Sequence, residues 1–223
     1  MEVSLKVAIT GANRGIGLAL AKYYVDQGHQ VYGICRRASE DLLKLKLNVV
    51  EQVDVADDHA VAELASRLKG VELDILINNA GVLSNQTMQF MEFDRVVQQI
   101  NVNAVGPLRV VSALRDNLKR GSKIAMITSR MGSIADNSSG GYYGYRMAKA
   151  ALNMAGVSLA NDLRDEGIAV ALIHPGFVKT AMVGYGGDIS TTEAAQRIAR
   201  LLSGLNLQNS GTFWHSNGEV LPW

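Results

Sequence analysis

The stretch "VAITGANRGIG", residues 7–17, places apolar and β-branched residues directly before a glycine-rich loop. An amphipathic segment, residues 15–28, follows at once, so the predicted order is strand, loop and helix. The loop glycines, Gly11, Gly15 and Gly17, follow a G-x-x-x-G-x-G spacing rather than the commoner G-x-G-x-x-G. Glycines there allow a tight turn and a close approach of a pyrophosphate to the helix N-terminus. The pattern favours a dinucleotide site over a glycine-rich turn without a ligand.

The rest of the chain repeats this alternation of strand and helix. The predicted strands are residues 3–10, 30–35, 47–55, 73–80, 122–129 and 168–175, with a weaker one at 211–216. The predicted helices are residues 15–28, 57–69, 92–118 with a break near Gly106-Pro107, 142–166 and 191–204. Repeated alternation indicates an α/β fold, a Rossmann-type doubly wound parallel sheet of about seven strands with helices on both faces. No repeat or linker divides the chain, so residues 1–223 are expected to form a single domain.

Composition excludes few partners but suggests none beyond a small molecule. Lysine and arginine number 22 against 21 acids, so no charge excess points to nucleic acid or to an anionic membrane surface. Cys35 is the single cysteine and cannot form an internal disulfide, and no Cys/His cluster has the spacing of a metal site. With no signal peptide and no apolar run of membrane-spanning length, a cytoplasmic protein is expected.

The end of the second strand, "CRRASE", indicates which dinucleotide is bound. A carboxylate near this point suits a free ribose 2′-hydroxyl, whereas a 2′-phosphate calls for arginine or lysine. Arg36 and Arg37 stand here, and Arg14 of the glycine loop can approach the same phosphate. These residues favour NADP (NADPH) over NAD, while Glu40 and Asp41, a few residues on, leave NAD as an alternative.

A tyrosine-rich stretch, "YYGYRMAKAAL", residues 142–152, offers a candidate acid-base pair. Tyr145 and Lys149 are four apart and share one face of the predicted helix. A phenol has a pKa of about 10, so it needs a neighbouring cation to act as a base near neutral pH. Tyr142 and Arg146 have the same spacing, so spacing alone does not identify the pair; these two are interpreted as substrate-mouth or surface residues.

With "TGANRGIG", then "NNAG" at residues 78–81, then Tyr145-x-x-x-Lys149 preceded by a serine, the sequence resembles the short-chain dehydrogenase/reductase superfamily over essentially its whole length. The stretches "SSGGYYGYR" and "GTFWHSNGEVLPW" are similar to the C-factor and sniffer-type carbonyl reductase branch. The resemblance implies an NADP-dependent oxidoreductase that reduces a ketone or aldehyde, with alcohol oxidation as the reverse reaction.

The same resemblance implies catalytic roles for named residues. Tyr145 would exchange a proton with the substrate oxygen, and Lys149 would favour the phenolate and hold the nicotinamide ribose. Ser129 would orient the carbonyl oxygen. It lies further before the tyrosine than is usual in the family, so Ser133 is the alternative.

Further residues are implied by matching motifs. Asn103 would anchor a water linking lysine to solvent, with Asn101 as its rival, although a buried asparagine often only satisfies backbone groups. Asp54 would contact the adenine amine, or else be a solvent-facing loop residue. The cofactor-binding residues implied are Gly11, Asn13, Arg14, Gly15, Ile16, Gly17, Arg36, Arg37, Asp54, Val55, Asn79, Ala80, Gly81, Tyr145, Lys149, Pro175, Gly176, Val178 and Thr180.

The substrate is less constrained by the sequence. Residues 182–192 form a glycine-rich candidate lid with little apolar surface, which suits a small or polar carbonyl compound or a permissive site. Met131, Tyr142, Met182 and Tyr185 are candidate lining residues, and His174 is interpreted as a packed histidine without a catalytic role. The family resemblance implies a homo-oligomer, a dimer or tetramer, paired through residues 101–118 and 142–166. A nucleotide-binding signalling protein of C-factor type, in which turnover is incidental, is the alternative function.

Overall fold

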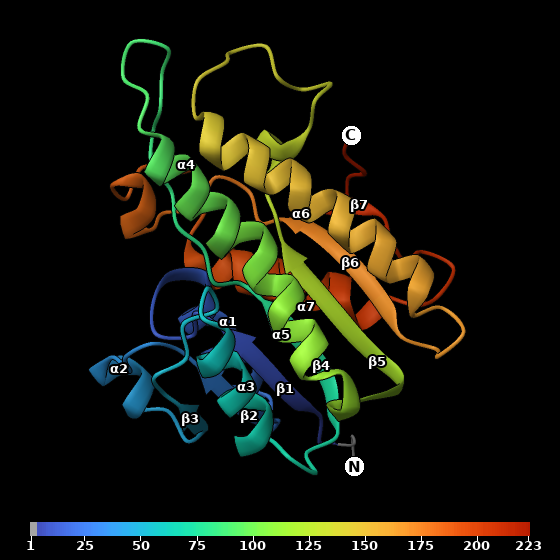
Figure 1. Cartoon of the computed structure of the whole chain (residues 1–223). Coiled ribbons are helices and arrows are strands. Elements are labelled where there is room, and N and C mark those ends of the chain that lie inside the picture. Colours follow the sequence, from blue (N-terminus) through green and yellow to red (C-terminus); the bar gives the residue numbers. More distant parts are fainter. Residues whose placement is uncertain (1–3) are drawn as a thin grey trace.

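A computed structural model describes residues 4–223 as one seven-stranded sheet in the order β3-β2-β1-β4-β5-β6-β7 (Figure 1). Val3, in the first predicted strand, lies outside the described residues. Every pair of neighbouring strands is parallel, which confirms the predicted sheet type. The strands are β1 (Lys6–Thr10), β2 (Gln30–Ile34), β3 (Asn48–Val50), β4 (Leu73–Asn78), β5 (Leu118–Ile127), β6 (Ala169–His174) and β7 (Phe213–His215).

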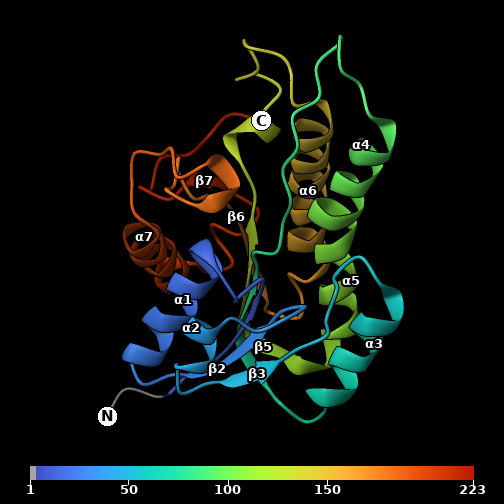
Figure 2. The ribbon, with the colours of Figure 1, turned by 90° about the vertical axis from the view of Figure 1, so that its left-hand side faces the viewer.

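Helices cover both faces of the sheet, as predicted (Figure 2). One layer holds α1 (Gly15–Asp26), α2 (Glu40–Leu43) and α7 (Thr191–Gly204), and the other holds α3 (Asp58–Arg67), α4 (Phe93–Ile100), α5 (Gly106–Ala113) and α6 (Tyr143–Asp162). Side chains alternate along each strand, so Ile124 joins the core beneath α5 and α6 while Ala125 joins the core beneath α1 and α7. Within residues 4–223, no helix combines the length and apolar character needed to cross a bilayer.

Three local predictions differ from the structure. The third strand ends at Val50 rather than at residue 55, because the chain turns at Gln52, whose φ is +63°. The short helix α2 was not predicted. The break expected near Pro107 is instead a π-helical turn, Asn101–Val105, through which the helix continues. A wider turn next to Pro107 accommodates a residue that has no backbone N–H to donate.

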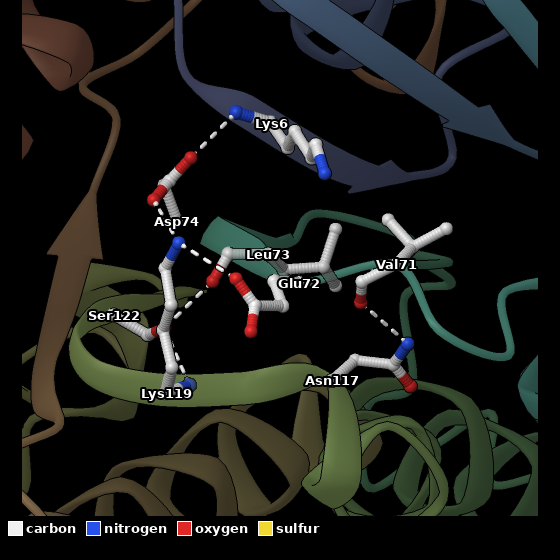
Figure 3. Close-up of polar contacts among 8 residues, drawn as sticks. All are labelled: Lys6, Val71, Glu72, Leu73, Asp74, Asn117, Lys119 and Ser122. Carbon is white, nitrogen blue, oxygen red and sulfur yellow. Dashed lines mark hydrogen bonds and ion pairs between the residues drawn. The ribbon is translucent and has the colours of Figure 1, made fainter. Parts of the chain in front are cut away.

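A polar network fastens the amino ends of the central strands (Figure 3). The Asp74 carboxylate accepts the backbone N–H of Lys6 at 2.8 Å and pairs with the Lys119 ammonium at 3.2 Å. Ser122 donates to the Leu73 carbonyl at 2.6 Å. These contacts hold β1, β4 and β5 together at their amino ends, on the side of the sheet opposite the loops that carry the motifs.

The strand order reverses direction between β1 and β4. The chain runs outward from β1 through β2 to β3, then returns to β4 and continues outward on the other side to β7. In such sheets a crevice forms beyond the carboxyl ends of the two central strands. The glycine loop follows β1 and the "NNAG" motif begins at the end of β4, so both reach this crevice.

Candidate active site

A cavity of about 1390 Å³ opens at the carboxyl ends of the strands. The loops that follow β1, β2, β4, β5 and β6 all contribute to its walls, together with the start of α6. It brings together every predicted site residue except Gly17, Arg37 and Asn103. The glycine loop and the tyrosine and lysine of α6 therefore line one continuous cavity.

The glycine loop is shaped by backbone conformations that other residues rarely adopt. Gly11 and Gly15 have φ of +67° and +56°, in the left-handed region that favours glycine. Gly17 does not line the cavity, but a Cβ there would collide with the carbonyl oxygen of Gly11. It therefore allows α1 to start close against the loop, while the other two glycines shape the cavity wall.

Asn79 and Thr10 join the loops after β4 and β1. The Asn79 amide donates to the carbonyl oxygens of Thr10 and Gly11 at 3.1 and 3.3 Å. The Thr10 hydroxyl accepts the backbone N–H groups of Asn79 and Ala80 at 3.0 and 3.1 Å. These four bonds hold the loops after β1 and β4 together as one unit. Asn78, by contrast, is buried with no hydrogen-bond partner for its side-chain amide among the described residues.

The basic residues expected at the 2′-phosphate do not all reach the cavity. Arg14 and Arg36 line it, whereas Arg37 is exposed and points elsewhere. Glu40 and Asp41, the acids that left NAD as an alternative cofactor, do not line the cavity either. Two arginines from two loops, Arg14 and Arg36, thus bring positive charge to this end of the site, together with Lys22 of α1.

Asp54 and Val55 line the same end of the cavity, after β3. One Asp54 oxygen accepts the backbone N–H of Ala56 at 2.9 Å, and the other lies 3.7 Å from the Arg36 guanidinium. The carboxylate is therefore fixed in place and faces the arginine of the neighbouring loop.

Tyr145 and Lys149 lie together on α6, as their spacing predicts. Lys149 is buried, and its ammonium donates to the Ile127 carbonyl at 2.8 Å. The ammonium nitrogen lies 5.7 Å from the centre of the Tyr145 ring. Burial lowers the pKa of Lys149 to about 7. Burial raises the pKa of Tyr145 to about 12, and hydrogen bonding with the Ser129 side chain opposes that rise. Without a ligand the phenol is thus protonated near neutral pH.

The two candidate serines lie in different environments. Ser129 follows β5, lines the cavity, and its hydroxyl accepts the Met131 N–H at 3.2 Å. Ser133 is buried outside the cavity lining, and its hydroxyl accepts the Asp136 N–H at 3.1 Å. Position favours Ser129 as the serine that meets a substrate.

Asn103 lies in the π-helical turn and is fully buried. Its side-chain oxygen accepts the Val82 N–H and its amide donates to the Val82 carbonyl, both at 2.8 Å. This side chain therefore satisfies backbone groups beside Gly81 and does not line the cavity. Asn101 does line the cavity, but its oxygen accepts from Arg109 at 2.7 Å.

The segment after β6 supplies the opposite wall through Pro175, Gly176, Val178 and Thr180. Ser216, for which no role was predicted, donates from its hydroxyl to the Pro175 carbonyl at 2.8 Å. This bond comes from beyond β7, so only the folded chain reveals it.

His174 packs against His215, with ring centres 5.0 Å apart. Burial, reinforced by His215 and Arg130, lowers the pKa of His174 to about 3. The ring is neutral at physiological pH, in keeping with a packed histidine.

The substrate side of the cavity is lined by the four predicted residues, Met131, Tyr142, Met182 and Tyr185. Arg146, expected at the substrate mouth or on the surface, lines it too, as do Arg130 and Phe177, which were not predicted there. Arg146 lies four residues after Tyr142, so the sequence predicts that both are on one face of the helix. The sequence does not distinguish whether that face lines a cavity or meets solvent.

This chain is similar to a family model, to known proteins and to solved structures. The sequence model described as "short chain dehydrogenase" matches residues 6–188. 1-Hydroxy-2-glutathionyl-2-methyl-3-butene dehydrogenase of Rhodococcus sp. (strain AD45) is 37% identical over an alignment of 223 positions, which covers 97% of this chain and 99% of that protein. C-signal of Myxococcus xanthus is 42% identical over 154 residues, covering 68% of this chain and 93% of its own length. Among solved structures, NADPH-bound carbonyl reductase from chicken fatty liver is 30% identical, covers 99% of both chains and superposes with a TM-score of 0.86.

Proposed function

This chain belongs to the short-chain dehydrogenase/reductase family, in its carbonyl reductase and C-factor-like branch, and we propose that it is a single-domain, NADP-dependent reductase of ketones or aldehydes. The observation that carries the proposal is the meeting of Ser129, Tyr145 and Lys149 in the same cavity as the glycine loop. Binding a nucleotide alone does not require an acid-base tyrosine beside a buried lysine. The reverse reaction would oxidise the corresponding alcohol.

The cavity fits a dinucleotide at its glycine-loop end. Gly11 and Gly15 line this end, and the left-handed Gly11 packs directly against the next loop, where a Cβ would lie only 2.9 Å from the Ala80 Cα. We propose that the loop amides hold the pyrophosphate, that Arg14 and Arg36 hold the 2′-phosphate, and that Asp54 meets the adenine. The reduced nicotinamide would supply the hydride when bound.

Tyr145 and Lys149 of α6, together with Ser129 from the loop after β5, would then bind the substrate oxygen and supply its proton. Ser129 donates a hydrogen bond to the carbonyl oxygen and stabilises the charge that develops on it. Tyr145 donates the proton, and its raised pKa keeps it in the acid form required for reduction. Lys149, when protonated, stabilises the phenolate left behind. A water route for returning the proton, anchored at Asn103, remains a prediction from the family resemblance.

Turnover of a panel of aldehydes and diketones with NADPH tests this function. We expect NADPH to be consumed in proportion to alcohol formed, because the acid, the orienting hydroxyl and the cofactor loop are all present. The measurement is NADPH absorbance together with product analysis. Tight NADPH binding without turnover of any carbonyl compound would instead favour the nucleotide-binding signalling protein.

Cofactor choice is tested by replacing Arg36. Arg36→Met is expected to weaken NADPH binding by about 10- to 100-fold, the usual value of a charge-assisted hydrogen bond, with little change for NADH. The measurement is calorimetry with both coenzymes. Arg37→Met is the matched control, because Arg37 follows directly in the chain but lies outside the cavity. Equal losses for NADPH and NADH, or a larger effect at Arg37, would contradict the assignment.

A further inference from the structure

Arg146 is a cation in the substrate half of the cavity that none of the roles above uses. It directly follows Tyr145 on α6, is half-buried and lines the cavity. Among residues 4–223, no carboxylate lies within 4.0 Å of its guanidinium. A guanidinium placed beside the reacting groups without an acidic partner can bind an anion.

The charge of the whole cavity supports this interpretation. Among residues 4–223, Asp54 is the one acid that lines it, against seven lysine and arginine residues: Arg14, Lys22, Arg36, Arg130, Arg146, Lys149 and Lys179. On the substrate side, Arg130 is ion-paired with Asp136 at 3.2 Å and lies 3.9 Å from Glu219. Arg130 is therefore neutralised by the protein, whereas Arg146 is not.

The guanidinium of Arg146 is also held in place before any ligand arrives. Its Nε donates to the carbonyl oxygens of Gly140 and Gly141 at 3.3 and 3.2 Å, and its Nη2 donates to the Ser139 hydroxyl at 2.9 Å. Gly140 and Gly141 have φ of +63° and +64°, in the left-handed region that favours glycine, and they belong to the loop that leads into α6 (Figure 1). Nη1 has no partner among the described residues. A guanidinium that is already held in place, with one nitrogen free, loses little side-chain entropy when it binds a carboxylate.

The same cavity also presents apolar surface. Phe177, Met182 and Tyr185 are large, exposed and line it. Exposed apolar side chains around a site indicate a ligand with an apolar part. The site thus combines apolar contacts with one unneutralised arginine next to the proton donor.

We propose that the substrate is a carbonyl compound that carries both an apolar portion and a carboxylate, and that Arg146 binds the carboxylate. The inference rests on the proposed reductase function and names its substrate class. Arg146 is a specificity-determining residue in this scheme, whereas Ser129 and Tyr145 act on the carbonyl itself.

A matched pair of probes tests the proposal: 4-formylbenzoate and its neutral isostere 4-formylbenzamide. We expect the wild-type protein with NADPH to prefer the carboxylate in kcat/KM, and Arg146→Met to reduce that preference by about 10- to 100-fold. Arg146→Lys should keep part of the preference, because it keeps the charge but loses the fork. Lys179→Met is the control, since Lys179 also lines the cavity but is exposed.

Calorimetry of both probes against the NADP⁺ complex gives a second readout that needs no turnover. Equal losses for acid and amide in Arg146→Met would show that Arg146 only braces the Ser139–Gly141 loop, and would overturn the proposal. A comparable effect of Lys179→Met would overturn it too. Should Arg146→Met not fold, a wild-type preference for the acid that weakens with added salt supports the proposal, and no preference overturns it. Absence of turnover with both aldehydes counts against the reductase function, while the binding data still decide the role of Arg146.

Discussion

Tyr145→Phe is expected to lower kcat for carbonyl reduction by about 10²- to 10⁴-fold, the usual contribution of general acid catalysis. The ring remains and only the hydroxyl is lost, so packing of α6 should be unchanged. NADPH affinity should stay near the wild-type value, because the proposed phosphate contacts come from other loops. Single-turnover kinetics and NADPH calorimetry measure the two quantities separately.

Tyr142→Phe is the matched control for this experiment. Tyr142 lines the same cavity three residues earlier but belongs to its substrate mouth, and its φ of +51° places it just outside the helix. We expect a small effect, confined to KM. If Tyr145→Phe kept its kcat, or lost NADPH binding in parallel with activity, Tyr145 would not be the proton donor.

The fold was predictable because its signals are local. The strand before the glycine loop and the helix after it occupy residues that adjoin in sequence, and their pattern repeats down the chain. The third strand was too long in the prediction, because Val53 and Val55 are apolar and buried without belonging to a strand. Periodicity records burial, and a buried loop segment carries the same signal as a strand end.

The candidate site was predictable where one motif holds both partners, and less so where partners come from distant segments. Tyr145 and Lys149 share a helix, so their spacing sufficed. Arg37 was predicted beside Arg36, but both lie in a bend after β2 and only Arg36 lines the cavity, which the sequence does not specify. Asn103 finds its partner in Val82, on another segment, and no pattern in the sequence specifies that pairing.

Lys149→Met should lower kcat for reduction by about 10²-fold or more, because removing it leaves the Tyr145 phenolate without the neighbouring cation that stabilises its charge. The same change has an unusual effect on stability. Burial lowers the pKa of Lys149 to about 7, whereas an unfolded lysine titrates at about 10.4. Between about pH 7 and about pH 10 the unfolded chain holds a proton that the folded protein lacks, so the free energy of unfolding rises with pH.

A methionine at position 149 does not titrate, so that pH dependence should disappear in the variant. Relative to Lys149→Met, the wild-type protein should lose about 3 kcal/mol of unfolding free energy between about pH 9 and about pH 6. Urea denaturation of the ligand-free protein at the two pH values measures the difference. The variant lacks the hydrogen bond to the Ile127 carbonyl at both pH values, so that loss cancels when the two unfolding free energies are subtracted.

Lys123→Met separates this effect from the loss of any partly buried lysine. Lys123 donates to the carbonyls of Leu202 and Ser203 near the end of α7, at 2.6 and 3.0 Å, and lies outside the cavity. Burial lowers its pKa as well, but it is only partly buried, so its linkage should be weaker. We expect Lys123→Met to keep kcat and to destabilise the protein at both pH values, since two helix-end carbonyls lose their donor. If Lys149→Met instead kept the wild-type pH dependence, the lysine would be solvated in solution, and it could not be the buried cation that the tyrosine requires.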